Sequence, residues 1–211
     1  MGCDIHIYCE YRNKATDMKW FNCDWYKRNL YYKKFDDNYI EPKWECIHAY
    51  DGRDYILFGI LAGVRNKSNP IISEPRGIPN DIHKQTKKEY NNAIKCMVYH
   101  SFSWLTIEEL INYRDKYNKV EISGYISSED AYKLDINGIK PNEWCKYTNI
   151  NDWVFRKWDS NTSDYIDGLL NCLYKRFDSV FHVYDFYTDA EKDQKRREYA
   201  KDARIIFWFD S

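Results

Sequence analysis

The chain has 211 residues, and its 32 Lys and Arg residues nearly balance its 33 Asp and Glu residues, giving a net charge of −1 at pH 7. A chain of this length can bury one sizeable hydrophobic core, and neither a linker nor a repeat divides it, so we expect residues 1–211 to form a single globular domain. The charge balance argues against generic binding to duplex nucleic acid, which requires a basic surface.

Three absences in the sequence indicate where the protein acts. A signal peptide, with a basic start followed by an apolar stretch, is absent. No apolar run is long enough to span a membrane. The seven cysteines are dispersed, with neither a CxxC pair nor zinc-finger spacing. We therefore expect a cytoplasmic protein with reduced, mostly buried thiols and no membrane partner.

The first predicted element is a strand over residues 3–11, where apolar and polar side chains alternate. A strand with one apolar face is typical of a sheet that covers a core on one side. The apolar face consists of Cys3, Ile5, Ile7, Cys9 and Tyr11, and the polar face of Asp4, His6, Tyr8 and Glu10.

Two further elements and a loop are predicted in the first third of the chain. Residues 18–26 have the composition of a second strand. Residues 54–66 are apolar nearly all round, which favours a buried helix that begins near Asp51 or Asp54. Prolines restrict the backbone of residues 67–80, so this segment is expected to be a stiff loop.

The remaining predicted elements are three helices and a final strand. Thr106 and Glu109 have the spacing of a capping box, which predicts the start of a helix. Residues 163–186 repeat apolar side chains with helical period, and the charged residues 189–201 are expected to form a solvated helix. An apolar strand follows over 203–210. Strands at both ends with helices between them predict an α+β domain. Its central, mostly antiparallel or mixed sheet contains both terminal strands and is packed with helices.

Asp4 and His6 form the first candidate functional group. On one face of a strand their Cα atoms are about 6.5–7 Å apart, so both side chains reach a common ion or ligand. If the terminal strands pair antiparallel, Asp210 joins them, and Arg204 forms a structural ion pair with Glu10. A parallel pair places Arg204 beside Asp4 instead. Asp4, His6 and Asp210 are therefore candidate ligands of a divalent metal ion, with Asp4 and His6 as candidate acid–base catalysts. The alternative is a structural hydrogen-bond pair.

A second candidate group has the composition of a phosphate site. The segment that starts at His100 carries two hydroxyls just before the capped helix, where helical N–H groups favour an anion. The alternative is that these serines satisfy local backbone groups. Arg76 lies between prolines, whose restricted backbone suits a guanidinium that grips phosphate, although an exposed loop arginine is the simpler interpretation. His100 is thus a third candidate catalytic residue, and the candidate phosphate-binding residues are Arg65, Arg76, Ser101, Ser103 and Arg204.

Five sequence blocks together resemble a family of bacteriophage-encoded proteins that begin MGCDIH and have about this length. The blocks are Met1-Gly-Cys-Asp-Ile-His6, Asp54-Tyr-Ile-Leu-Phe continuing to Val64-Arg-Asn66, Pro75-Arg-Gly-Ile-Pro79, His100-Ser-Phe-Ser-Trp-Leu105 and Phe207-Trp-Phe-Asp210. The resemblance carries no established activity with it. It implies a protein of the infected bacterium's cytoplasm with an accessory role, including interference with nucleotide-based immune signalling.

These observations lead to one main functional hypothesis and two alternatives. The main hypothesis is a hydrolase, such as a metal-dependent phosphodiesterase, that acts on a phosphorylated small molecule such as a cyclic nucleotide signal. One alternative is a non-catalytic protein that sequesters the same molecule. The other is an inhibitor that masks a host protein with its aromatic surface. A homo-oligomer is compatible with each of them.

Overall fold

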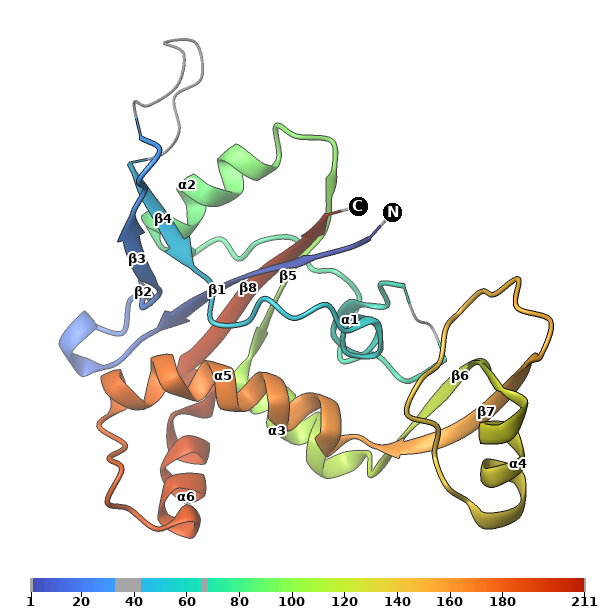
Figure 1. Cartoon of the computed structure of the whole chain (residues 1–211). Helices are drawn as coiled ribbons and strands as arrows, with labels where there is room; N and C mark the ends of the chain where they lie inside the picture. The colour runs from blue at the N-terminus through green and yellow to red at the C-terminus, as the bar shows by residue number, and fades with distance from the viewer. Residues whose placement is uncertain (1, 33–42, 66–67, 211) are drawn as a thin grey trace.

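The centre of the molecule is a four-stranded antiparallel sheet that contains both ends of the described chain (Figure 1). The structure is a computed structural model, and it describes residues 2–32, 43–65 and 68–210. The strand order is β2–β1–β8–β5, with β1 (Ile5–Tyr11) beside β8 (Ala203–Asp210). The predicted α+β class and the pairing of the two terminal strands are both confirmed.

The register of β1 and β8 decides between the two pairings left open by the sequence. The strands run antiparallel, with Ile5 opposite Phe209 and Glu10 opposite Arg204. The parallel alternative, which places Arg204 beside Asp4, is therefore wrong.

The other strands and the helices surround this sheet. The strands are β2 (Phe21–Asn22), β3 (Trp25–Arg28), β4 (Trp44–Ile47), β5 (Tyr99–Thr106), β6 (Lys119–Ser127) and β7 (Trp153–Asn161). The helices are α1 (Tyr55–Ala62), α2 (Lys84–Ala93), α3 (Ile107–Lys116), α4 (Ser128–Asn137), α5 (Ser163–Phe181) and α6 (Asp189–Tyr199). Strands β3 and β4 form one separate ribbon, and β6 and β7 form another.

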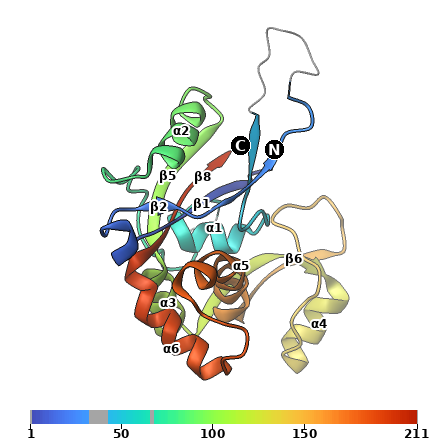
Figure 2. The same cartoon turned by 90° about the vertical axis from the view of Figure 1, so that its left-hand side faces the viewer.

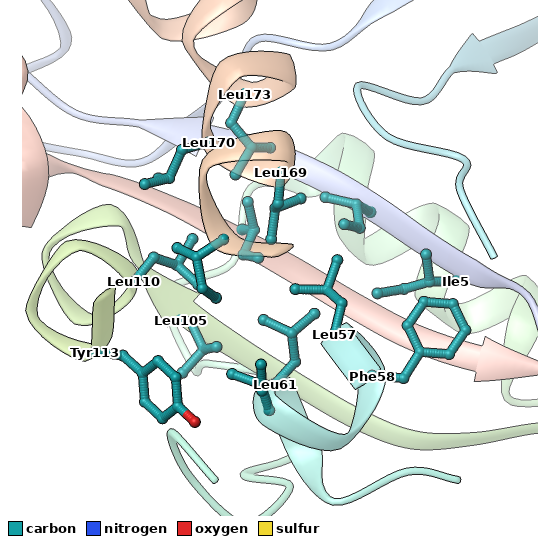
Figure 3. Close-up of a cluster of buried hydrophobic side chains, with 14 of the residues drawn as sticks. Ile5, Leu57, Phe58, Leu61, Leu105, Leu110, Tyr113, Leu169, Leu170 and Leu173 are labelled. Carbon is teal, nitrogen blue, oxygen red and sulfur yellow. The ribbon is translucent and has the colours of Figure 1, made fainter. Parts of the chain in front are cut away.

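The main core lies between the apolar face of the central sheet and helices α1, α3 and α5 (Figure 3). Every apolar residue of α1 after Tyr55 is buried, and α5 contributes a stripe of leucines. Each fully buried leucine, isoleucine or phenylalanine side chain stabilises the fold by about 1.5–3 kcal/mol relative to its exposed state. The core side chains labelled in Figure 3 are Ile5, Leu57, Phe58, Leu61, Leu105, Leu110, Tyr113, Leu169, Leu170 and Leu173.

A second, smaller cluster covers the opposite face of the same sheet. Helix α2 packs there, and Figure 2 shows it on the side away from α5 and α6. The cluster is aromatic: Trp208 is 2% exposed and packs on Tyr8 and Phe102, with Tyr90 of α2 above it. The polar face of β1 is therefore half covered rather than open to solvent.

Several helix boundaries follow from local capping. Asp54 accepts hydrogen bonds from two backbone N–H groups at the start of α1, and Gly63 ends that helix with a φ of 68°. The helix is thus shorter than predicted, and Asn66 lies outside the described residues. Thr106 and Glu109 form the predicted capping box of α3. Helix α5 ends before residue 186, because His182 adopts a φ of 59°.

Two sequence predictions are wrong. Residues 18–26 do not form one strand, because the Asp24 N–H donates to the Asn22 side chain at 3.1 Å and turns the chain between β2 and β3. The segment from His100 does not gather before α3, because it forms β5, which pairs with β8. His100 and Thr106 are therefore about 20 Å apart along this strand.

Candidate functional site

His6 and Asp210 meet at one end of the β1–β8 pair. The His6 Nε2 atom lies 3.1 Å from Asp210 Oδ2, and the Asp4 N–H donates to Asp210 Oδ1 at 2.9 Å. Both side chains are partly exposed, at 24% for His6 and 29% for Asp210. When Nε2 carries the proton, the carboxylate orients the ring and leaves Nδ1 to exchange a proton with a ligand.

A small cavity adjoins the His6 ring. It has a volume of about 190 Å³, and α2 forms one of its walls. The Tyr99 ring meets the His6 ring edge-on at 5.2 Å between centroids, and the Trp208 ring lies nearly parallel to it at 6.4 Å. The cavity is lined by His6, Tyr8, Glu89, Asn92, Ala93, Tyr99 and Trp208.

Glu89 is the carboxyl group of this cavity. Burial raises the pKa of Glu89 above its ordinary value, and Gln85 donates a hydrogen bond to Glu89 Oε1 at 3.1 Å. A carboxyl with a raised pKa keeps its proton at higher pH and can act as a general acid. The cavity therefore contains an imidazole that can exchange a proton with a ligand and a carboxyl that can act as a general acid.

His48 is a second imidazole beside His6. The two ring centroids are 5.6 Å apart, and the His48 Nδ1–H donates to the Ile7 carbonyl at 2.9 Å. Burial lowers the pKa of His48, which favours its neutral form. A neutral His48 does not repel a proton on His6. Sequence reasoning missed His48, Glu89 and Tyr99 as a group, because they converge only through long-range packing.

Asp4 does not join the expected metal site. Arg53 donates from Nε and Nη2 to the two Asp4 carboxylate oxygens, each at 2.7 Å. This guanidinium lowers the pKa of Asp4. Among the described residues, no three His, Cys, Asp or Glu side chains come together as a metal ion requires. The predicted ligand set of Asp4, His6 and Asp210 therefore does not fit a metal ion.

Three other predicted residues lie near this end of the sheet, outside the cavity. Arg65 follows α1 with a φ of 63°, and its Nη2 lies 3.4 Å from the Gly2 carbonyl oxygen. His100 stacks on Phe209 at 6.1 Å, and its Nδ1 is 3.0 Å from Ser101 Oγ. Ser101 has a φ of 53° at the bulge of β5.

The remaining predicted phosphate ligands lie elsewhere and are already paired. Arg204 bonds to the Glu10 carboxylate at 2.7 Å, and the two side chains are 2% and 0% exposed. The Arg76 guanidinium pairs with the Glu109 carboxylate at 2.6 Å, and the backbone N–H of Arg76 donates to the buried Ser103 hydroxyl at 3.2 Å. Glu10, the partner of Arg204, is about 13 Å from His6 along β1. The predicted catalytic residues and these remaining phosphate ligands therefore lie in two separate places.

A groove of about 650 Å³ runs beside Arg204 and Arg76. The Arg204 guanidinium lies 3.9 Å from the centre of the Trp20 ring, and Arg76 lies 5.0 Å from that of Trp104. Arg12, also in the groove, pairs with Asp202 at 2.8 Å. Each of these arginines has a carboxylate partner, so the groove offers an anion less charge than its composition implies.

No protein-family model, curated protein or solved structure matches this chain. Among the described residues, no helix is both long enough and apolar enough to cross a membrane.

Proposed function

We propose that this protein binds a phosphorylated small molecule, such as a nucleotide, and hydrolyses it with His6 as the general base. The contact between His6 and Asp210 beside a cavity carries the proposal. A positioned imidazole that takes a proton from water accelerates hydrolysis by about 10²–10⁴-fold. Asp210 is the positioning residue, because it holds the ring and stabilises the imidazolium that forms.

The proposed step uses the two titratable groups of the cavity. His6 takes a proton from a water molecule, whose oxygen attacks phosphorus. The bond between phosphorus and the leaving oxygen breaks, and that oxygen takes a proton from Glu89. Arg53, which bonds to Asp4 at the same end of β1 as His6, is the cation that we assign to the phosphate. Its bond to Asp4 is exposed, so exchanging partners costs little.

The size of the cavity limits the ligand. Pockets that enclose a whole drug-sized molecule have volumes of about 300–1,000 Å³, so 190 Å³ accommodates part of a nucleotide. The rest of the ligand then extends over the rim. The resemblance to phage proteins supports a nucleotide immune signal of the infected bacterium's cytoplasm as the ligand.

Sequestration without turnover is the second candidate. The Tyr99 ring in the cavity wall favours it, because this partly exposed aromatic side chain offers a surface on which a base packs. A protein of this kind needs no acid–base group.

Product analysis separates the two candidates. Cyclic mononucleotides and cyclic dinucleotides are incubated with the protein, which is then denatured, and the released compounds are resolved by chromatography. We expect a hydrolysed product from at least one probe, and much less of it with Asp210→Asn. Intact probe recovered from a tight complex indicates sequestration, and no binding to any probe contradicts both candidates. Repeating the assay in EDTA tests for a metal; proton transfer by His6 alone leaves turnover unchanged.

A further inference from the structure

Among the segments that the structure describes, none pairs with the outer side of the long strand β7 in the β6–β7 hairpin. Strand β7 pairs with β6 along its full length and without a bulge. On its other side, β6 contacts Cys145 and Asn69. The hairpin lies at the end of the molecule away from β3 and β4 (Figure 1).

The hydrogen bonds of β6 determine which backbone groups of β7 point outward. Tyr125 exchanges two backbone hydrogen bonds with Cys145, at 2.8 and 3.0 Å, so its N–H and C=O point away from β7. Its partner Phe155 is therefore in a non-hydrogen-bonded pair and directs its own N–H and C=O to the open edge. Glu121 repeats this arrangement through the Asn69 side chain, at 2.7 and 2.9 Å. The odd-numbered residues of β7 thus present their backbone groups outward.

The side chains of these residues are exposed as well. Phe155 is 48% exposed, and Lys157 and Asp159 are also exposed. Two hydrogen bonds are described for outward backbone groups of β7, and both are local: the Arg156 Nη1–H donates to the Phe155 carbonyl at 3.0 Å, and the Trp153 N–H donates to the Ile150 carbonyl at 3.2 Å. A straight edge of this length, with no proline or bulge, is a template for another strand.

We propose that β7 pairs antiparallel with β7 of a second copy of this chain, about a two-fold axis at Trp158. In this register Lys157 lies opposite Asp159 of the second copy, and the symmetry repeats the pair. The outward backbone groups of these residues then bond to one another. A register centred on Lys157 places two lysines opposite each other, which is unfavourable. Charge therefore selects the register, in which Lys157 and Asp159, already paired within the hairpin with Glu121 at 3.0 Å and Lys119 at 3.5 Å, each gain a second partner of opposite charge. The interface is independent of the function proposed for His6.

Two single charge reversals and their mixture test this interface. Lys157→Asp places two carboxylates opposite each other, and Asp159→Lys places two ammonium groups opposite each other. The dimer of each variant alone should have a dissociation constant at least about tenfold higher than that of the natural chain. The reason is that the cross-strand charge pair, and therefore its reversal, occurs twice in the dimer. An equal mixture of the two variants restores opposite charges at both pairs, so it should associate as the natural chain does.

The measurement is the molar mass of the full chain by sedimentation equilibrium, over about 1 µM to about 1 mM, the range in which small interfaces associate. Lys140→Asp makes the same charge change at an exposed residue outside β7 and should dimerise normally. Circular dichroism checks that the variants are folded. A natural chain that stays monomeric throughout overturns the proposal and leaves the edge to a strand of another protein. Variants that dimerise unchanged, or a mixture that stays monomeric, also overturn it.

Discussion

The two ends of the β1–β8 pair carry similar polar groups in different surroundings. At the open end, defined by Asp4, His6 and Asp210, the side chains are partly exposed, and His6 borders a cavity. At the closed end, defined by Glu10 and Arg204, both side chains are almost fully buried. The polar face of one strand therefore supplies both a partly exposed imidazole and a buried ion pair, and the two ends differ in burial.

Removal of Arg204 should have the largest effect and tests the closed end. Arg204→Ala leaves the Glu10 carboxylate buried without its guanidinium, which should lower the free energy of unfolding by about 3–5 kcal/mol. Urea denaturation measures this change. The double variant Glu10→Leu/Arg204→Met removes both charges and should cost less than Arg204→Ala. If Arg204→Ala lowers the free energy of unfolding by less than about 1 kcal/mol, the loss is typical of exposed pairs. Burial then does not make the closed end more important for stability than the open end.

Removal of His6 should affect turnover rather than stability. His6→Ala is expected to lower turnover of a hydrolysed probe by about 100-fold, because the general base is lost. The melting temperature should change little, since the side chain is partly exposed and makes one hydrogen bond. His182→Ala, at the end of α5, is the matched control and should keep full activity. A stable His6→Ala protein with undiminished turnover places the function elsewhere.

Two carboxyl groups, those of Glu10 and Asp24, differ in their partners, and the pH dependence of stability should reflect this difference. Glu10 has an arginine, whereas Asp24 accepts hydrogen bonds from the Cys9 N–H and the Asn22 amide. Burial raises the pKa of Asp24 to about 7, so between about pH 4 and 7 the folded chain binds a proton that the unfolded chain has lost. This contribution to stability is present at low pH and disappears as the pH rises to about 7.

Asp24→Asn isolates this contribution. As the pH rises from about 4 to about 7, the loss of the Asp24 contribution should lower the free energy of unfolding of the natural chain by about 1 kcal/mol for each pH unit. Denaturation curves at several pH values should show a flatter dependence for the variant. Parallel curves for the two proteins mean that Asp24 has an ordinary pKa in the folded chain.

The smallest effect is expected at Arg53. Like Arg204, it donates from Nε and Nη2 to a carboxylate, but the side chains of Arg53 and Asp4 are 52% and 46% exposed. Arg53→Ala should therefore change the free energy of unfolding much less than Arg204→Ala does. Urea denaturation beside Arg204→Ala gives the direct contrast. Equal losses for the two variants mean that burial does not separate the two ends.

Much of the sheet could be predicted because its signals are local. The alternation from Cys3 to Tyr11 identifies the buried face of β1, and the capping box at Thr106 marks the start of α3. The alternation of β6 was harder to detect, because Gly124 interrupts it. The Trp144 ring lies where a Gly124 side chain would begin, with a ring carbon 2.6 Å from the position of an added Cβ. This glycine is required by packing from a distant segment.

The candidate site was only partly predictable for the same reason. Asp210 could be placed near His6 once the terminal strands were assumed to pair, because register follows from alternation. The positions of Glu89 and Tyr99 could not be deduced, since they depend on how α2 and β5 pack on the sheet. The prolines around Arg76 gave no indication that Glu109 would pair with it.

The most direct test asks which end of the sheet binds a ligand. Proton–nitrogen NMR spectra resolve the indole N–H of each tryptophan, and Trp208 lines the cavity whereas Trp20 and Trp104 line the groove at the closed end. Titration with a cyclic nucleotide that binds should shift the Trp208 signal and the backbone signals of His6 and Tyr99, and leave Trp20 and Trp104 in place. Shifts confined to Trp20 and Trp104 would contradict the assignment of function to the His6 end.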